Sequence, residues 1–338
     1  MEPIVALAQV RSRFLFALIL GGLLISVAYG QSIEDAHIIP QTNSDRKSPI
    51  GEIASLNNHT RNRPLRVDVN LVLVPVTVND SRNRPVVSLK KEDFALYDDD
   101  KLQEIQYFSA EQEPISVVLL VDISKSMTQR IDIERAAIVE FFKNAHPEDE
   151  YFAITFSDRP RELADSTQSI DEVQQKLTAV QPGGPTAMLD AVYLAVSKLR
   201  SARYKRKAIL ILSDGGDNAS QYTMREIRSL VRESDVRIYA VGLFETFLFS
   251  AFEEKMGGRW LGEITDATGG RTITVDSKEK VPEAAAEISR ELRNQYVLGY
   301  RAPKSVATRW RKIKVKVTSS ATDNALRAYY KKGYITAE

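Results

Sequence analysis

Residues 115–127, with the sequence ISVVLLVDISKSM, decide the fold class of this chain. Their first part, residues 115–121, is an apolar run broken by one serine, which is typical of a strand buried on both faces. An aspartate and two serines then occupy alternate positions, as Asp122, Ser124 and Ser126. Because alternate side chains of an extended chain project the same way, we expect these three to converge above the end of the strand.

The pattern around this strand alternates between strand and helix. Further apolar runs predict buried strands at residues 151–156, 208–212, 236–243 and 271–275. Apolar residues at helical spacing predict helices between and after them, at residues 138–145, 173–180, 189–199 and 281–292. The alternation predicts an α/β fold with a doubly wound, mainly parallel sheet that has helices on both faces. Ligands of such sheets bind beyond the carboxyl ends of the strands, where the strand order reverses.

Two later segments add oxygen-bearing side chains at that edge of the sheet. Thr186 follows a loop rich in glycine and proline, and Asp214 follows the predicted strand at 208–212. Each of the five residues alone could be a helix cap. Their common position at one edge of the sheet predicts a metal site instead. A site made only of oxygen donors suits Mg²⁺, Mn²⁺ or Ca²⁺ and disfavours zinc and copper.

The five positions resemble the metal-ion-dependent adhesion site (MIDAS) of von Willebrand factor type A (VWA) domains. That site has Asp-x-Ser-x-Ser, then a Thr after a glycine-rich loop, then an Asp after a later strand. The resemblance implies that Ser124, Ser126 and, in the ligand-bound state, Thr186 contact a divalent cation directly. Asp122 and Asp214 are then expected to act mainly through bound water. The resemblance also implies a protein partner whose Asp or Glu completes the coordination of the cation.

A single carboxylate contact does not give specificity, so the neighbouring loops are expected to form the rest of the interface. The residues that we predict to bind the partner are Asp217, Asn218, Tyr222 and Phe247. Phe247 belongs to the aromatic segment 244–252, for which a helix packed on the sheet is the alternative interpretation.

The resemblance to a VWA domain covers about residues 113–298. The whole chain is similar to a bacterial secreted VWA-related family of acidobacterial type, on softer features such as Asp93-Phe94 and Tyr296-x-Leu298-Gly299-Tyr300. Patterns typical of strands flank the α/β part, at residues 65–112 and 299–338. Each flank has too few strands to bury a core alone. We therefore expect the flanks to pair into one small β-sandwich-like domain, into which the α/β domain is inserted.

Two charged stretches lie in the flanks. Asp98-Asp99-Asp100 predicts the solvated turn of a hairpin, because no spaced ligand pattern follows that would favour the alternative of a calcium loop. Lys312, Lys314 and Lys316 alternate with apolar residues. This pattern predicts the solvated face of a half-buried strand in preference to a patch that binds nucleic acid or an anionic surface.

Composition excludes several classes of protein. The chain has 338 residues, of which 43% are hydrophobic, so global disorder is excluded. It has 46 Lys and Arg against 45 Asp and Glu, and the net charge of +1 argues against a nucleic-acid-binding protein that depends on a strong basic field. The absence of cysteine excludes disulfides, thiolate metal sites and a cysteine nucleophile, and three histidines leave little room for zinc chemistry.

The first residues have the pattern of a secretory signal peptide. Arg11 and Arg13 precede the apolar run 14–27, and Ala28-Tyr29-Gly30 provides small residues for cleavage. The alternative is an uncleaved anchor, but the run is shorter than a membrane span of about 20 residues. We predict a signal peptide at 1–30 and a flexible linker at 31–64. The protein is then secreted or located in the periplasm or cell envelope of a bacterium, without an integral membrane span after cleavage.

The sequence favours a non-enzymatic, divalent-metal-dependent protein-binding or adhesion module. One alternative is a Mg²⁺-dependent hydrolase with Ser124 as nucleophile and His146 as base, but His146 is predicted at a helix end remote from the site. No Gly-x-x-x-x-Gly-Lys or Gly-x-Gly-x-x-Gly motif is present. The other alternative is a structural envelope protein without a metal-gated ligand. The sequence does not predict the oligomeric state or the identity of the partner.

Overall fold

The structure is a computed structural model, and it describes residues 71–110, 112–243, 251–302, 308–318 and 325–336. The predicted signal peptide and linker, and the predicted partner residue Phe247, lie outside the described residues. In the part of the chain that is described, no helix is both long and apolar enough to cross a membrane.

The central sheet has six strands in the order β10-β9-β8-β5-β6-β7. Their bounds are β5 Ser116–Asp122, β6 Glu150–Phe156, β7 Pro160–Thr167, β8 Lys207–Ser213, β9 Val236–Leu243 and β10 Thr272–Val275. All neighbouring pairs are parallel except β6 and β7, which are antiparallel. The strand order reverses at β5, whose neighbours are β6 and β8. The predicted fold class is therefore confirmed, and β5 ends at the expected switch point of the sheet.

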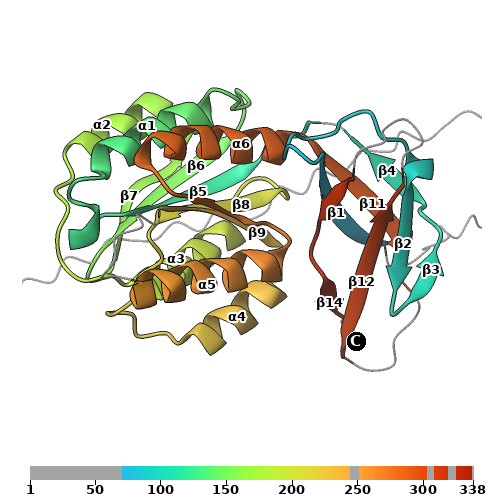
Figure 1. The fold of residues 1–338 in the computed structure, drawn as a ribbon. Helices are drawn as coiled ribbons and strands as arrows, with labels where there is room; N and C mark the ends of the chain where they lie inside the picture. Colours follow the sequence, from blue (N-terminus) through green and yellow to red (C-terminus); the bar gives the residue numbers. More distant parts are fainter. Residues whose placement is uncertain (1–70, 111, 244–250, 303–307, 319–324, 337–338) are drawn as a thin grey trace, which may run out of the picture. The chain divides into compact units, whose positions relative to one another are not determined.

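Helices cover both faces of this sheet (Figure 1). One face packs against α1 Ile131–Phe142, α2 Ile170–Thr178 and α6 Val281–Arg293. The other packs against α3 Met188–Arg200, α4 Met224–Glu233 and α5 Ala251–Thr268. Alternate residues of β5 enter opposite cores, with Val117 and Leu119 on one side and Val118 and Leu120 on the other. Burial on both faces explains why residues 117–121 of this strand are all apolar.

The flanking segments form two antiparallel four-stranded sheets, in the orders β13-β1-β11-β4 and β14-β12-β2-β3. The strands from the first flank are β1 Leu71–Asn79, β2 Phe94–Asp98, β3 Lys101–Gln103 and β4 Tyr107–Ser109. The strands from the second are β11 Gln295–Arg301, β12 Trp310–Val317, β13 Arg327–Tyr329 and β14 Gly333–Ile335. Three short 3-10 helices complete the described elements, at Lys91–Asp93, Lys125–Met127 and Lys278–Lys280. Both sheets therefore combine strands from before and after the α/β part of the chain.

The two flanking sheets share one core. Val76 of β1, Leu96 of β2, Leu298 of β11 and Ile313 of β12 are all buried in it. The lysines of β12 are exposed, while the residues between them point inward, as their alternation predicts. Strand β11 begins before residue 299, so the flanking sheet takes its first residues from the end of the segment that we expected to belong to the α/β domain.

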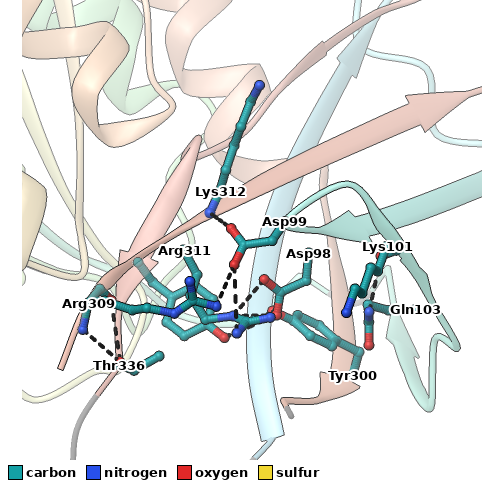
Figure 2. Close-up of polar contacts among 10 residues, drawn as sticks. Asp98, Asp99, Lys101, Gln103, Tyr300, Arg309, Arg311, Lys312 and Thr336 are labelled. Carbon is teal, nitrogen blue, oxygen red and sulfur yellow. Dashed lines mark hydrogen bonds and ion pairs between the residues drawn. The ribbon is translucent and has the colours of Figure 1, made fainter. Parts of the chain in front are cut away.

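The prediction of a fully solvated acidic turn was wrong for Asp98. This residue is completely buried, because it continues the inward-facing alternation of Phe94 and Leu96 along β2. Its carboxylate accepts hydrogen bonds from Arg311 Nε at 2.8 and 3.1 Å and from the Tyr300 hydroxyl at 2.8 Å, as Figure 2 shows. The turn itself consists of Asp99 and Asp100, both with positive φ (47° and 62°).

Candidate metal centre

Asp122 is the last residue of β5 and is completely buried. Its Oδ1 accepts a hydrogen bond from the backbone N–H of Ser124 at 2.9 Å, and its Oδ2 accepts one from the Ser213 hydroxyl at 2.6 Å. Ser213 is the last residue of β8, the neighbouring strand. The two bonds fix the carboxylate between the ends of the two strands.

The two serines of the motif lie directly after this aspartate. Ser124 is buried and has extended backbone, and it caps the short helix Lys125–Met127. That turn brings the exposed Ser126 back toward it, so the two hydroxyl oxygens are 3.0 Å apart. The sequence Asp-x-Ser-x-Ser thus places a buried carboxylate and a pair of hydroxyls at the end of one strand.

Thr186 lies in a loop that is held against this first loop. Gly183 donates its N–H to the carbonyl of Ile123 at 2.7 Å, and the N–H of Lys125 donates to the carbonyl of Gly184 at 2.9 Å. Gly184 has φ +88°, a conformation that favours glycine. Thr186 is buried, and none of the hydrogen bonds found among the described residues joins its hydroxyl to the other four predicted ligands.

Asp214 follows β8 and keeps a partly exposed side chain. Its Oδ1 accepts the N–H of Gly216 at 3.1 Å, and its Oδ2 lies 3.8 Å from Arg130 Nη1. The next residue, Gly215, has φ +78°, and a Cβ atom there would be 2.5 Å from the carbonyl oxygen of Gly257 in α5. A glycine is therefore required beside Asp214, both by the backbone conformation and by the close approach of α5.

The buried carboxyl groups at this edge repel one another. Burial, and next the charge of Asp214, raise the pKa of Asp122 to about 6, against the hydrogen bonds from Ser213 and Ser124 that lower it. Burial likewise raises the pKa of Glu134, on α1, well above its ordinary value, with smaller contributions from Asp122 and Asp214. A divalent cation at this edge would relieve the repulsion.

Glu134 is a residue of this region that we did not predict. Its side chain is buried, and neither carboxylate oxygen has a hydrogen-bond partner among the described residues. It lines a small internal cavity of about 10 Å³ together with Arg130 and Ser213. The signal in the sequence was a glutamate at helical spacing from Ile131 and Ile138, which both face the core.

Replacing Glu134 by glutamine is expected to stabilise the protein at neutral pH by about 1 kcal/mol, because a buried carboxyl without a partner is replaced by a neutral group of the same shape. The pKa of Glu134 is raised, so the folded state favours its protonated form and the wild-type protein loses stability as pH rises. Urea unfolding at pH 5 and pH 8 measures this. The gain in Glu134→Gln should be larger at pH 8, and an equal gain at both pH values would contradict the explanation.

The predicted partner residues have different surroundings. Asp217 Oδ2 accepts hydrogen bonds from the backbone N–H of Leu189 at 2.8 Å and from the Ser220 hydroxyl at 2.6 Å. Asn218 Oδ1 accepts the N–H of Thr186 at 2.8 Å. The side-chain oxygens of both residues thus hold the loops together.

Tyr222 is the third predicted partner residue and is only partly buried. Its ring stacks on that of Tyr193, an exposed residue of α3, with 4.1 Å between the ring centroids. The pair presents an aromatic surface near the loop that contains Asp217 and Asn218. The backbone N–H of Tyr222 also donates a hydrogen bond to Asp190 of α3 at 3.0 Å.

His146 lies at the other end of the sheet. The backbone N–H of His146 donates to Asp149 Oδ2 at 2.9 Å. Asp149 Oδ1 accepts the backbone N–H of Ile115, immediately before β5. Ser124 follows the opposite end of β5, about 20 Å away along the strand. Of the three histidines, this is the only one within the described residues, and it is not placed to act as a base for Ser124.

Comparison with known proteins agrees with the fold. Residues 117–216 match the family model of the von Willebrand factor type A domain, and all five predicted metal ligands lie within that range. The chain therefore contains a VWA domain.

Two curated relatives are similar to the chain over this region. The inter-alpha-trypsin inhibitor heavy chain H4 of Bos taurus is 27% identical over 134 residues, which is 36% of this chain and 15% of the relative. The protein of the same name from Sus scrofa is 26% identical over 144 residues, which is 38% of this chain and 16% of the relative. The chain thus spans only about a sixth of the length of these relatives.

Solved structures similar to the chain include a von Willebrand factor type A protein from Catenulispora acidiphila, with 11% identity and a TM-score of 0.47. The match covers 79% of this chain and 72% of that structure. Another is the conserved hypothetical protein BatB from Bacteroides thetaiotaomicron, with 16% identity and a TM-score of 0.42, over 52% of this chain and 98% of that structure.

Proposed function

We propose that this protein is a non-enzymatic, divalent-metal-dependent protein-binding or adhesion module. We propose that it binds an acidic group of a partner protein through a MIDAS-like cluster, which consists of Asp122, Ser124, Ser126, Thr186 and Asp214. The VWA domain at residues 117–216 supports the general part, because this domain suggests a role in protein binding or adhesion. The metal-dependent part rests on one observation. The Ser124 and Ser126 hydroxyls lie 3.0 Å apart beside the fixed carboxylate of Asp122, on the β5 side of the switch point.

The donor set fits a hard cation. In the described residues there is no cluster of three or more His, Cys, Asp or Glu side chains placed to hold a metal. The site that we propose uses neutral hydroxyls for part of the coordination. Ser124, Ser126 and Thr186 would supply them, with Asp122 and Asp214 balancing part of the charge. A bound Mg²⁺, or Mn²⁺ or Ca²⁺, would supply a positive charge for a carboxylate of the partner. Because few of the donors are anionic, that charge is not fully neutralised within the protein.

We also propose that the protein is exported to the periplasm, the cell envelope or the medium of a bacterium. The basic residues, apolar run and small residues within positions 1–30 support this part of the proposal. Export would expose the metal-binding face of the VWA domain to partners outside the cytoplasm. Mass spectrometry of the N-terminus after expression in a bacterial host tests the proposal, and a chain that retains residues 1–30 and stays in the cytoplasm would contradict it.

Cation binding should be saturable and should depend on Asp122. Titration of the full chain with Mg²⁺, Mn²⁺ and Ca²⁺ in a calorimeter is expected to give one site, weakened at least tenfold in Asp122→Ala, because the buried carboxylate and the Ser124 loop that it holds are both lost. Asp132→Ala is the control, because Asp132 is an exposed aspartate of α1 that pairs with Arg135 and is not one of the five predicted ligands. Equal affinity in the wild type and in Asp122→Ala would end the metal proposal.

Dependence on an acidic partner group is tested separately. The full chain is probed with synthetic peptide pairs that differ only by Glu or Gln, and by Asp or Asn, with Mg²⁺ or with EDTA. Peptides with a carboxylate should bind in Mg²⁺ and lose binding in EDTA. Binding that survives chelation would favour a surface that acts without the metal.

A further inference from the structure

A large cavity lies between the flanking sheet β13-β1-β11-β4, on its face away from the shared core, and the end of the central sheet at which the parallel strands begin. Its volume is about 820 Å³, within the range of small-molecule sites, and it is far from the MIDAS-like cluster because β8 and β9 contribute their first residues to it. The lining includes Leu73 of β1, Arg206 just before β8, Lys207 of β8, Arg237 of β9, and Lys331.

One wall of this cavity is apolar and exposed. Leu71 and Leu73 of β1, Tyr107 of β4 and Ile335 of β14 are four of the nine large apolar side chains that are exposed among the described residues, and all four line it. Gly299 of β11 lies behind them, and a Cβ atom there would be 2.8 Å from the Cβ of Tyr107 and 3.1 Å from the side chain of Leu73. The missing side chain of Gly299 therefore lets these two residues close over the strand and form a continuous apolar surface.

The opposite side of the cavity is cationic. The basic residues that line it are Lys205, Arg206, Lys207, Arg237 and Lys331, against the two acidic residues Glu113 and Asp235. Arg206 donates to the backbone carbonyls of Glu113 at 3.0 Å and Leu292 at 2.6 Å. Its Nε is buried, and no described residue provides a hydrogen-bond partner for that atom.

Two further cations of the cavity, the buried Arg237 and the partly exposed Lys331, also donate mainly to backbone carbonyls. Arg237 donates to the Thr77 hydroxyl at 3.0 Å and to the carbonyl of Pro75 at 2.6 Å. Lys331 donates to the carbonyl of Ser234 at 2.7 Å, and its nearest carboxylate in the described part of the chain, on the fully exposed Asp235, is 4.0 Å away. Backbone carbonyls satisfy the donors but do not neutralise the charge.

Elsewhere this protein pairs its buried arginines with carboxylates. Arg293 pairs with Asp149, Arg311 with Asp98, and Arg271 with Glu291, and all three carboxylates are completely buried. Arg237 is the buried arginine of the described residues that differs from these three, because its partners are the Thr77 hydroxyl and the Pro75 carbonyl and not a carboxylate. Burial, and next the nearby charges of Arg293 and Arg237, lower the pKa of Arg206 to about 10, with Glu113 and Asp149 opposing them. An anion in the cavity would remove this repulsion.

We propose that this cavity binds a monomeric amphipathic anion of the fatty-acid type, with its carboxylate beside Arg206, Arg237 and Lys331 and its acyl chain along Leu71, Leu73 and Tyr107. The excess of five basic over two acidic residues in the lining favours an anion. The exposed apolar wall favours a ligand with an apolar body. The site would work independently of the metal centre at the other edge of the sheet.

Calorimetric titration of the full chain with decanoate, in EDTA, tests the proposal, with decanol and acetate as comparison ligands. Decanoate is expected to bind one-to-one and at least tenfold more tightly than either comparison ligand, because only decanoate has both the charge and the chain. Equal affinity for decanoate and decanol, or no saturable binding of decanoate, would overturn the proposal. Binding to phosphatidylglycerol vesicles without binding to decanoate would also overturn it and would assign the basic residues to a membrane surface.

Two variants locate the ligand. Leu73→Glu places a negative charge on the exposed apolar wall and should weaken decanoate at least tenfold, whereas Leu102→Glu makes the same change on the exposed face of β3, outside the cavity, and should have no effect. Arg206→Gln should weaken decanoate but not decanol. Because Arg206 also braces two backbone carbonyls, Leu73→Glu is the variant that decides: wild-type affinity in it would reject the site.

Discussion

Replacing Asp98 by asparagine is expected to destabilise the protein by about 3–5 kcal/mol, the usual loss when one partner of a buried ion pair is removed. Asp98 is completely buried and accepts hydrogen bonds from Arg311 and Tyr300 (Figure 2). It also accepts one from the Tyr334 hydroxyl at 3.2 Å. Without the Asp98 carboxylate, the buried guanidinium of Arg311 keeps only Asp99, which is partly exposed and 3.7 Å away, as a counter-charge. Urea unfolding measures the loss of stability.

Asp100→Asn is the matched control. Asp100 is exposed in the turn that follows, with a positive φ that asparagine tolerates, so the same chemical change should alter stability by less than about 0.5 kcal/mol. In the double variant Asp98→Asn, Arg311→Gln, a neutral amide pair replaces the uncompensated charge, and part of the stability should return. Fluorescence of Trp310, next to Arg311 on β12, can follow the flanking sheets if Trp260 of α5 is replaced by phenylalanine. A loss below about 1 kcal/mol in Asp98→Asn would show that this buried ion pair does not stabilise the sheet of β2 and β12.

The error about Asp98 shows which structural information is available from sequence and which is not. A run of three aspartates suggests a turn because such residues favour turns and avoid burial. The opposing signal, Phe94, Leu96 and Asp98 at alternate positions, was present in the sequence but weaker. What settles the position is Arg311, which is 213 residues away along the chain and supplies the counter-charge.

Of the two edge strands of the central sheet, β10 was predicted together with the strands buried on both faces, and β7 was not. The apolar sequences of β5 and β8 have no other common explanation. Strand β7, Pro160–Thr167, was missed, because it begins with proline and has only two buried residues, Ala164 and Thr167. It lies at the edge of the sheet and pairs with β6 alone, so its sequence is not constrained on both sides.

The candidate metal centre could likewise be predicted only in part. Residues at strand ends, such as Asp122 and Asp214, could be placed near one another, because parallel strands end at a common edge. The contact that orients Asp122 could not be predicted, since Ser213 carries no motif of its own, and neither could the buried Glu134 nearby. Ser213 precedes Asp214 and would be read as part of the strand, yet its hydroxyl holds Asp122 Oδ2 at 2.6 Å.

Without a divalent cation, the protein is expected to lose about 3 kcal/mol of stability between about pH 4 and pH 6 through Asp122 alone. Burial and the charge of Asp214 raise the pKa of this residue from 3.8 to about 6 in the folded state, and each unit of difference corresponds to about 1.4 kcal/mol. In this range the unfolded chain has already released the proton that the folded protein keeps. Stability therefore falls as pH rises, and above about pH 6 the full loss is present. Urea unfolding in EDTA at a series of pH values measures the slope.

The variant Asp122→Asn separates this effect from other titrating groups, Glu134 among them. Its side chain cannot ionise, so the part of the slope that belongs to Asp122 should disappear and leave a constant loss from the altered hydrogen bonds with Ser213 and Ser124. Asp132→Asn, at an exposed position of α1, should keep the wild-type slope. If the proposed site binds Mg²⁺, adding the cation at pH 7 should stabilise the wild-type protein but not the Asp122→Asn variant. The reason is that only an ionised Asp122 contributes its charge to the site. Identical slopes in the wild type and in Asp122→Asn would mean that Asp122 is already ionised at low pH and does not oppose folding.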